Sequence, residues 1–191
     1  YTDFNLDIKK GEKIVLKAPS GKGKSTLINQ ILGFIEFEEG SIEVFGKRVS
    51  ETNIHEIRSM TGWLPQETGQ FNNTAHQMLI QPFLYKSNKD QYPTKQKITD
   101  TLKKFRLQEG ILHKNSYDIS GGELQRLLLC SIYMLNKPLI LLDEPTSALD
   151  AENAEVVREL FLDLDTTVVI ATHDDSWSEK VDRVVVLEEG G

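Results

Sequence analysis

The 191-residue sequence contains a single cysteine and no long apolar run. Cys130 alone cannot form an internal disulfide or a cysteine metal cluster. Its place in a helical apolar pattern indicates a small core residue. A single cysteine also fits a protein of the reducing cytosol. The longest apolar runs, such as 139–142 and 168–171, have the length of strands and fall far below the ~20 residues that span a bilayer. We expect no signal peptide, and any membrane association should come through a partner.

Positive charge is scarce as well. The chain has 22 Lys and Arg against 29 Asp and Glu, which gives a formal net charge of −7. Proteins that bind nucleic acid usually present a basic face, so we expect no nucleic-acid partner. With 39% hydrophobic and 27% charged residues, the composition is that of a globular chain with one well-packed core.

Apolar spacing predicts strands and helices that alternate, as in an α/β protein with a parallel sheet. The expected strands are 4–8, 14–17, 42–45, 60–64, 139–143, 168–171 and 184–187, and the expected helices are 24–32, 122–135 and 151–164. Between Gln66 and Ser120 the sequence becomes polar and helix-forming, which predicts an inserted helical lobe.

A glycine-rich segment between a predicted strand and a predicted helix has the composition of a phosphate-binding loop. Its glycines let backbone N–H groups surround a phosphate, its lysine can reach the β- and γ-phosphates, and its serine hydroxyl can bind Mg²⁺. The residues expected to bind the nucleotide here are Ser20, Gly21, Lys22, Gly23, Lys24, Ser25 and Thr26. Ala18 replaces the first glycine of the usual G-x-x-x-x-G-K-[ST] pattern, and we expect the strand end to tolerate it. The alternative is an ordinary turn between a strand and a helix.

Two acidic residues, Asp143 and Glu144, follow a strand of four apolar residues. Open α/β sheets bind ligands at the carboxyl ends of their strands. We therefore expect Asp143 to help hold Mg²⁺ and Glu144 to polarise the water that attacks the γ-phosphorus. Because acids also commonly end strands and cap helices, a purely structural role is the alternative.

A second glycine-rich turn, at 119–126, opens its own helix far along the chain. Such a helix start offers backbone N–H groups to an anion, although Ser120 is also suited to cap the helix in a capping box with Glu123. One chain seldom needs two phosphate sites. We therefore infer that Ser120, Gly121 and Gly122 serve a nucleotide that another copy of the protein holds.

In this order, the motifs resemble those of the ATP-binding-cassette (ABC) ATPases, and 119–126 resembles the family signature. The resemblance implies three further site residues. Gln66 matches the Q-loop glutamine, which contacts Mg²⁺ or the attacking water; Asp150 ends the D-loop, which crosses the dimer interface; and His173 matches the switch histidine, which reaches the γ-phosphate. Taken singly, each has a simpler interpretation: a surface glutamine, a helix cap and a structural histidine.

The resemblance also implies the architecture: an α/β P-loop NTPase (RecA-like) core with a parallel sheet, a small N-terminal antiparallel β part and an inserted α-helical subdomain. We expect a single ABC ATPase domain over 1–191. Its nucleotide-binding core should occupy about 1–66 and 126–191, and its helical subdomain, with the signature, about 67–125. We further expect truncation at both ends, with the adenine-stacking aromatic residue upstream of Tyr1.

The same resemblance implies that the chain should be the ATP-binding and ATP-hydrolysing subunit of an ABC transporter, with ATP and Mg²⁺ as cofactors. The implied partners are a second copy, in an ATP-sandwich dimer, and a separate transmembrane permease, so the protein should be cytoplasmic and peripheral on the inner face of the membrane. The stretches 79–83 and 111–115 resemble a branch described as iron or metal exporters. The alternative is a soluble ABC switch in DNA or macromolecular assembly. A transporter subunit should expose an apolar groove lined from Trp63 to Phe83, whereas a DNA-associated switch should show a basic path.

Overall fold

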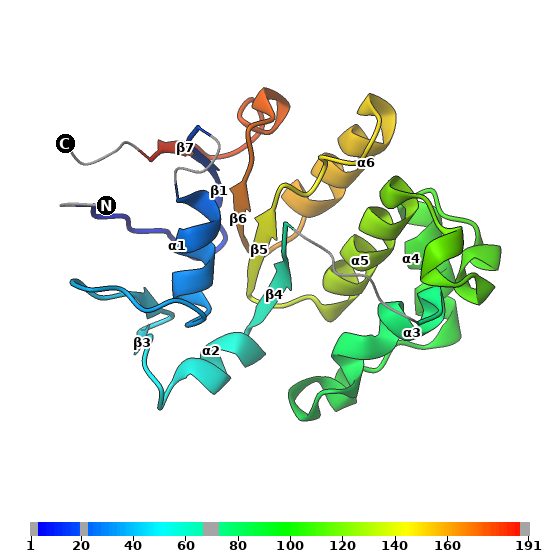
Figure 1. Ribbon diagram of the computed structural model, residues 1–191, viewed down its shortest axis with the longest axis horizontal. Helices are drawn as coiled ribbons and strands as arrows, with labels where there is room; N and C mark the ends of the chain where they lie inside the picture. The colour runs from blue at the N-terminus through cyan, green and yellow to red at the C-terminus, as the bar shows by residue number, and fades with distance from the viewer. Residues whose placement is uncertain (1–3, 20–22, 67–72, 188–191) are drawn as a thin grey trace. The chain divides into compact units, whose positions relative to one another are not determined.

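The computed structural model describes residues 4–19, 23–66 and 73–187. These residues form two compact units: a sheet unit drawn from 1–63, 137–144 and 165–191, and a helical unit drawn from 64–136 and 145–164. The main sheet has five strands in the order β4-β5-β6-β1-β7 (Figure 1). Its strands are β1 (Lys13–Lys17), β4 (Thr61–Leu64), β5 (Leu139–Asp143), β6 (Thr167–Ala171) and β7 (Arg183–Val186).

The central strands explain why the sheet is parallel. Strands β5 and β6 are buried along their whole length, as expected of the continuous apolar strands of parallel sheets that are covered on both faces. Strand β6 pairs in parallel with β5 and with β1, and β1 pairs in parallel with β7. Asp143 is in register with Ala171, so β5 and β6 end side by side. The residues that follow these two strands are therefore neighbours.

Helix α1 (Lys24–Ile31) packs Leu27 and Ile28 into the core of the sheet unit. It ends before Gly33, as the sequence predicts. Gly33 has a φ of +64°, and a Cβ there would lie 2.7 Å from the Ile54 side chain, so both the backbone conformation and the packing favour glycine.

A small antiparallel pair also belongs to the sheet unit. It consists of β2 (Glu43–Val44) and β3 (Lys47–Arg48), and α2 (Ile54–Ser59) follows. Phe45 and Gly46 join the two strands, and both have positive φ, as a tight two-residue hairpin turn requires. The expected strand at 4–8 shows the alternating burial of a strand but is assigned to none.

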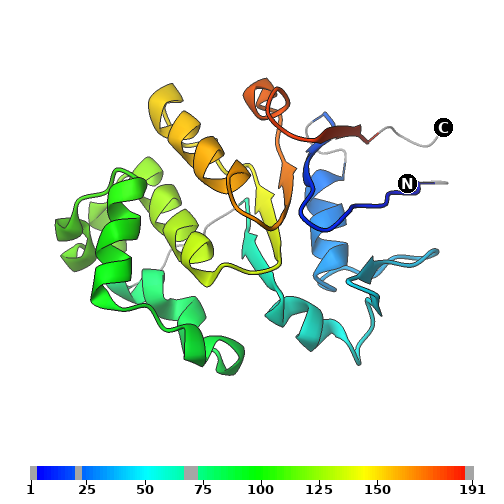
Figure 2. The same cartoon turned by 180° about the vertical axis from the view of Figure 1, so that it is seen from behind.

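The helical unit contains α3 (Ala75–Ile80), α4 (Lys95–Lys104), α5 (Gly121–Leu135) and α6 (Ala151–Leu162) (Figure 2). Short 3-10 turns at Gln81–Leu84, Lys86–Gln91, Glu109–His113 and Ser116–Asp118 connect them, and a fifth at Asp175–Trp177 lies in the sheet unit. No described helix combines the length and the apolar character needed to cross a bilayer.

Three aromatic rings form the centre of the helical unit. Phe105 lies 5.6 Å from Tyr133 and 6.2 Å from Phe161, measured between ring centroids, and all three pairs meet edge to face. Because Tyr133 is on α5 and Phe161 is on α6, both helices cluster with this unit. The sequence-based division had assigned α6 and most of α5 to the nucleotide-binding core.

Candidate nucleotide-binding site

The phosphate-binding loop predicted from the sequence leads from β1 into α1. Ser20, Gly21 and Lys22 lie outside the described residues. Gly23 caps α1 with a φ of 90°, a left-handed conformation that glycine adopts without strain. The Lys24 side chain is 8% exposed, and its Nζ donates a hydrogen bond to the carbonyl oxygen of Ala18 at 2.8 Å. The lysine is thus folded back over the start of its own loop.

Asp143 at the end of β5 is suited to a cation. It is 4% exposed, and its buried Oδ1 has no hydrogen-bond partner among the described residues. Burial raises the pKa of this carboxyl, while the hydrogen bond from Ser25 and the charge of Lys24 act in the opposite direction. A buried carboxylate oxygen without a partner is costly, and a divalent cation would satisfy it.

Within the described part of the chain, no cluster of three or more His, Cys, Asp or Glu side chains can hold a metal ion. The Ser25 hydroxyl and one Asp143 oxygen could supply two ligands, which are too few to surround a metal ion with protein groups alone. This pair does fit Mg²⁺, which binds through one or two protein ligands and completes its shell with waters and substrate phosphates.

Glu144, directly after β5, has a left-handed backbone conformation. Its φ is 48°, a strained value for a non-glycine residue, and its N–H donates to the carbonyl oxygen of Ala171 at 2.8 Å. Its Oε1 lies 2.9 Å from His173 Nδ1, and its Oε2 accepts a hydrogen bond from Thr172 Oγ1 at 3.0 Å. The structure thus brings together two predicted catalytic residues, Glu144 and His173.

Thr172 was not singled out in the sequence. Its only signal was its position, as a polar residue between a buried strand and His173. Contact between Thr172 and Glu144, 28 residues apart, becomes visible only once β5 and β6 are paired.

The predicted signature turn starts α5 in the helical unit. Ser120 caps this helix: its Oγ accepts from the Glu123 N–H at 3.2 Å, and its own N–H donates to Glu123 Oε2 at 2.9 Å. The capping box is confirmed, and the hydrogen bond from the Ser120 N–H lowers the pKa of Glu123. Ser120 and Gly121 are both exposed, so the first turn of α5 is open to an anion.

The signature turn packs against the loop 147–150. A Cβ on Gly122 would lie 2.9 Å from the carbonyl oxygen of Ala148. Gln125 Oε1 accepts from the Ala148 N–H at 3.0 Å, and its Nε2 donates to Ser147 Oγ at 3.4 Å. Sequence reasoning missed Gln125, which joins two predicted motifs within one unit.

The two other predicted residues of the helical unit have simpler surroundings. Asp150 is exposed and caps α6, since its Oδ1 accepts from the Asn153 N–H at 2.8 Å, and this hydrogen bond lowers its pKa. Gln66 is exposed and follows β4, and 67–72 lie outside the described residues.

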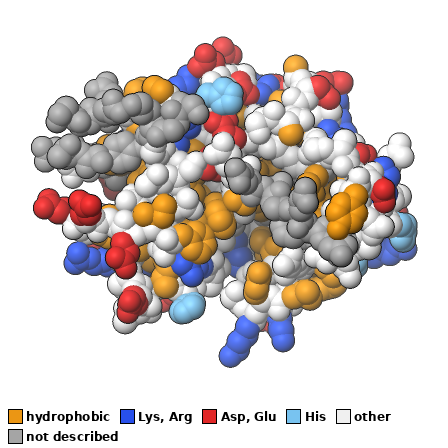
Figure 3. Space-filling view, in the orientation of Figure 1, with side chains coloured by type: hydrophobic (Ala, Val, Ile, Leu, Met, Phe, Trp, Pro, Cys, Tyr) orange, Lys and Arg blue, Asp and Glu red, His pale blue; other side chains and the backbone are white. Residues whose placement is uncertain are grey.

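One end of the apolar groove expected from Trp63 to Phe83 is contradicted by the structure, and 67–72 within that stretch lie outside the described residues. Phe83 is only 1% exposed, because it packs inside the helical unit, so it cannot line a surface groove. Trp63 is half-buried in the sheet unit, and its ring lies 5.2 Å from that of Phe34, which is 51% exposed. On the face shown in Figure 3, basic side chains are scattered among acidic and apolar ones and form no continuous path.

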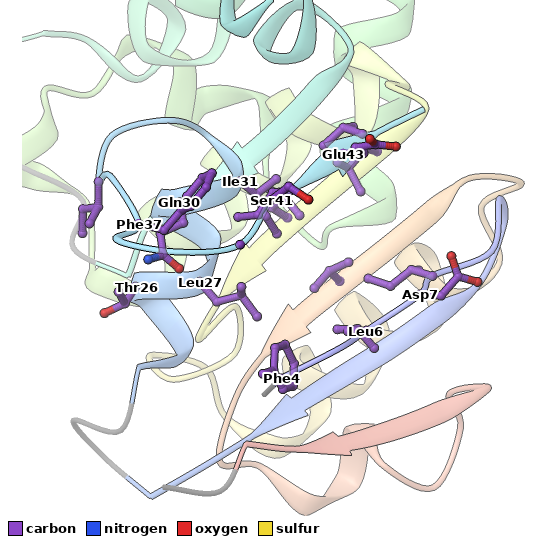
Figure 4. Close-up of a pocket in the computed structure, with 18 of the residues that line it drawn as sticks. Phe4, Leu6, Asp7, Thr26, Leu27, Gln30, Ile31, Phe37, Ser41 and Glu43 are labelled. Atoms are coloured by element: carbon purple, nitrogen blue, oxygen red, sulfur yellow. The ribbon is translucent and has the colours of Figure 1, made fainter. Parts of the chain in front are cut away.

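A cavity of about 720 Å³ lies in the sheet unit beside α1 (Figure 4). Apolar side chains such as Phe4, Leu6 and Leu27 line it. Its acidic lining residues are Asp7, Glu36, Glu38, Glu39 and Glu43. Thr26 is the one predicted nucleotide-binding residue among its described lining residues. Because the acidic groups repel a triphosphate, the cavity does not replace the glycine-rich loop as the phosphate site.

Comparison with known proteins agrees with this geometry. Residues 1–147 match the ABC transporter family. The chain is 34% identical to the energy-coupling factor transporter ATP-binding protein EcfA1 of Leuconostoc mesenteroides, over 100% of this chain and 72% of that protein. It is also 34% identical to the probable ABC transporter ATP-binding protein PEB1C of Campylobacter jejuni, over 98% of this chain and 80% of that protein.

Solved structures show the same fold. The ATP-binding cassette MJ0796, in a dimeric post-hydrolysis state bound to ADP and Pi, superposes with a TM-score of 0.83 at 29% identity, covering 96% of this chain and 84% of that one. CbiO1 from Clostridium perfringens, part of the ABC transporter complex cbiONQ, gives a TM-score of 0.78 at 26% identity, covering 97% and 76%. The α/β P-loop NTPase fold predicted from the sequence is thereby confirmed. The chain belongs to the ABC transporter family and is an ATP-binding, ATP-hydrolysing subunit of an ABC transporter.

Proposed function

We propose that the whole chain works as a single ATPase domain that holds Mg·ATP at the carboxyl ends of β1 and β5. One observation carries this proposal: Glu144, 8% exposed, is fixed at the end of β5 in contact with His173. A carboxylate held in this way is suited to orient and polarise a water for attack on the γ-phosphorus. The His173 side chain is 75% exposed, so it would be accessible to the γ-phosphate once it leaves Glu144.

The remaining residues of the site bind the phosphates and the metal. Lys24 and the backbone N–H groups of its loop would bind the β- and γ-phosphates. Ser25, Asp143 and Gln66 would hold Mg²⁺, which neutralises phosphate charge in the transition state. The buried, unpartnered Oδ1 of Asp143 supports this assignment.

Two substitutions separate binding from chemistry. Glu144→Gln preserves the shape of the side chain and should leave Mg·ATP binding intact while it reduces turnover about 100-fold or more. Lys24→Ala should instead weaken ATP binding, because it removes a charge that meets phosphate in the ground state. Near wild-type turnover in Glu144→Gln would remove Glu144 from the role, and unchanged affinity in Lys24→Ala would contradict the phosphate-loop assignment.

We further propose that two copies close around two ATP molecules. Each nucleotide would be bound by the sheet unit of one copy and by Ser120 and Gly122 of the other. Asp150 would lie at the interface between the two copies. The exposed, capped start of α5 supports this arrangement, as does the dimeric state of MJ0796. Because much of such an interface is ligand, dimerisation should depend on ATP.

Sedimentation of Glu144→Gln with and without ATP tests the dimer. Ser120→Asp added to this variant keeps a good helix cap but places a negative charge where the partner's γ-phosphate must dock. It should abolish the ATP-dependent dimer, whereas Ser87→Asp, at another exposed serine of the helical unit, should not. A Glu144→Gln protein that stays monomeric in saturating ATP, or a Ser120→Asp variant that dimerises normally, would refute the shared site.

A separate membrane permease is the proposed partner, which would place the protein at the inner face of the membrane. EcfA1 is a transporter ATP-binding protein and CbiO1 is part of a transporter complex, which supports this. Phe34, which is exposed and in tilted contact with the Trp63 ring, offers an apolar contact. Phe34→Glu should release the protein from membranes during fractionation, and Phe45→Glu, at an exposed phenylalanine of the β2–β3 turn, is the control. Equal retention of both variants would contradict the contact.

A metal ion is the proposed cargo, on the resemblance at 79–83 and 111–115. Leu79, Phe83 and Ile111 belong to these stretches and are buried, at 0%, 1% and 3% exposure. These side chains therefore pack inside the helical unit and are not available to contact cargo. Cargo contact would fall to the permease. The test compares the metal content of cells that express wild type with that of cells that express Glu144→Gln, and identical contents would contradict a metal cargo.

A further inference from the structure

Glu144 is held by three consecutive residues at the end of β6. The Ala171 carbonyl oxygen accepts from the Glu144 N–H, Thr172 binds one carboxylate oxygen, and His173 binds the other. The two side-chain contacts differ in one respect. Thr172 is 1% exposed, whereas the His173 side chain is 75% exposed.

The surroundings of Thr172 decide which way its hydroxyl points. A hydroxyl has one proton to donate and two lone pairs that accept. The Asp174 N–H donates to Thr172 Oγ1 at 3.1 Å and so occupies a lone pair. The hydroxyl proton is therefore directed to Glu144 Oε2, 3.0 Å away, and an ionised carboxylate is an acceptor only.

The backbone of Thr172 is anchored as well. Its N–H donates to the carbonyl oxygen of Leu16 on β1 at 3.4 Å, and β6 pairs with both β1 and β5. The Asp174 side chain in turn accepts from the Ser176 N–H at 3.0 Å, which holds the turn that follows. Thr172 is thus set in the rigid sheet.

We propose that Thr172 is a positioning residue for Glu144: its buried hydroxyl fixes the carboxylate while His173 is released to the nucleotide. The proposal rests on the role given above to Glu144. When His173 leaves Oε1 for the γ-phosphate, the Thr172 hydrogen bond and the strained backbone still aim the carboxylate at the attacking water. Loss of this bond would let the carboxylate turn, and a misplacement of about 1 Å can cost about 100-fold in rate.

Steady-state ATPase kinetics and equilibrium ATP binding test the proposal on Thr172→Val and Thr172→Ser. Valine keeps the shape and removes the hydroxyl, and kcat should fall about 10- to 100-fold with KM and ATP affinity unchanged within about twofold. Serine restores the hydroxyl and should recover kcat to within about threefold of wild type. If Thr172 acted only through packing, kcat would depend on its methyl group, which serine lacks, and Thr172→Ser would not restore kcat. If the valine variant does not fold, Thr172→Ala replaces it.

A double-mutant cycle that combines Thr172→Val with Glu144→Gln completes the test. If Thr172 acts through Glu144, adding Thr172→Val to Glu144→Gln should cause no further loss of kcat, because residues that act as a unit are not additive. A valine variant with wild-type kcat, a serine variant no better than valine, or multiplicative losses in the double variant would each overturn the proposal. Near wild-type turnover in Glu144→Gln alone would instead sink the proposed role of Glu144, so the two failures are distinguishable.

Discussion

Adding a methyl group to Gly122 should strain the contact between the signature turn and the loop 147–150. Neither Gly121 nor Gly122 has a positive φ, so alanine is permitted at both by the backbone. A Cβ on Gly122 would lie 2.9 Å from the carbonyl oxygen of Ala148, whereas one on Gly121 would meet only the Ala148 Cβ at 4.0 Å. The oxygen belongs to the backbone, which must move by about half an ångström to restore an ordinary contact.

The two alanine variants form a matched pair. Both gain helix propensity, about 0.5–1 kcal/mol at most, and this gain largely cancels in their difference. Overpacking typically costs about 1–3 kcal/mol, so Gly122→Ala should be less stable than Gly121→Ala by that amount. For a chain of this length, each kcal/mol shifts the melting temperature by about 2–4 °C.

Urea unfolding followed by circular dichroism, with thermal melts, measures this difference. Turnover should fall in Gly122→Ala as well, because the Gln125 hydrogen bond to the Ala148 N–H is disturbed. Equal stability of Gly121→Ala and Gly122→Ala would refute the close approach as the reason for glycine at 122.

Three further predictions concern single groups. Ala18→Gly should change ATP affinity by no more than about twofold, because the backbone at Ala18 does not have a positive φ. The same change should lower the free energy of unfolding by up to about 1 kcal/mol. A large gain of affinity in a nucleotide titration would show that alanine impairs the loop. Burial raises the pKa of Asp143 above 3.8, so its charge destabilises the fold increasingly as pH rises through the raised pKa and fully at pH 7. Asp143→Asn should therefore melt about 2 °C or more higher than wild type without Mg²⁺ and gain less from Mg·ATP, and a lower melting temperature would contradict this. The Ser120 N–H holds the pKa of Glu123 below 4.5, so the Glu123 charge stabilises the fold above pH 4.5, and the effect is lost as pH falls through the lowered pKa. Glu123→Gln, which can keep the capping box, should be about 0.3–1 kcal/mol less stable at pH 7. Urea unfolding over a pH series should show this deficit shrinking below pH 4.5, and a deficit that stays constant through the acid range would argue against a charge effect.

Short-range features could be predicted from the sequence because their causes lie within a few residues. The capping box joins Ser120 to Glu123, three residues on, and α1 ends where Gly33 supplies a left-handed φ. Buried parallel strands such as β5 and β6 show as continuous apolar runs. The order of the motifs, from Lys24 to His173, was also enough to predict the P-loop NTPase fold.

Contacts between distant segments were decided by the tertiary structure alone. The bond between Thr172 and Glu144 exists because β5 and β6 pair in parallel and in register, and a shift of one residue would turn the side chains to the other face. Phe83, predicted at a surface groove, is buried because packing within the helical unit rather than local pattern sets its environment. From its sequence alone the chain could thus be assigned its local turns, its helix caps and the candidate residues of the proposed nucleotide site, because these features depend on neighbours a few residues apart. Only the folded sheet decided which of these residues touch, because strand register is a property of segments far apart in the chain.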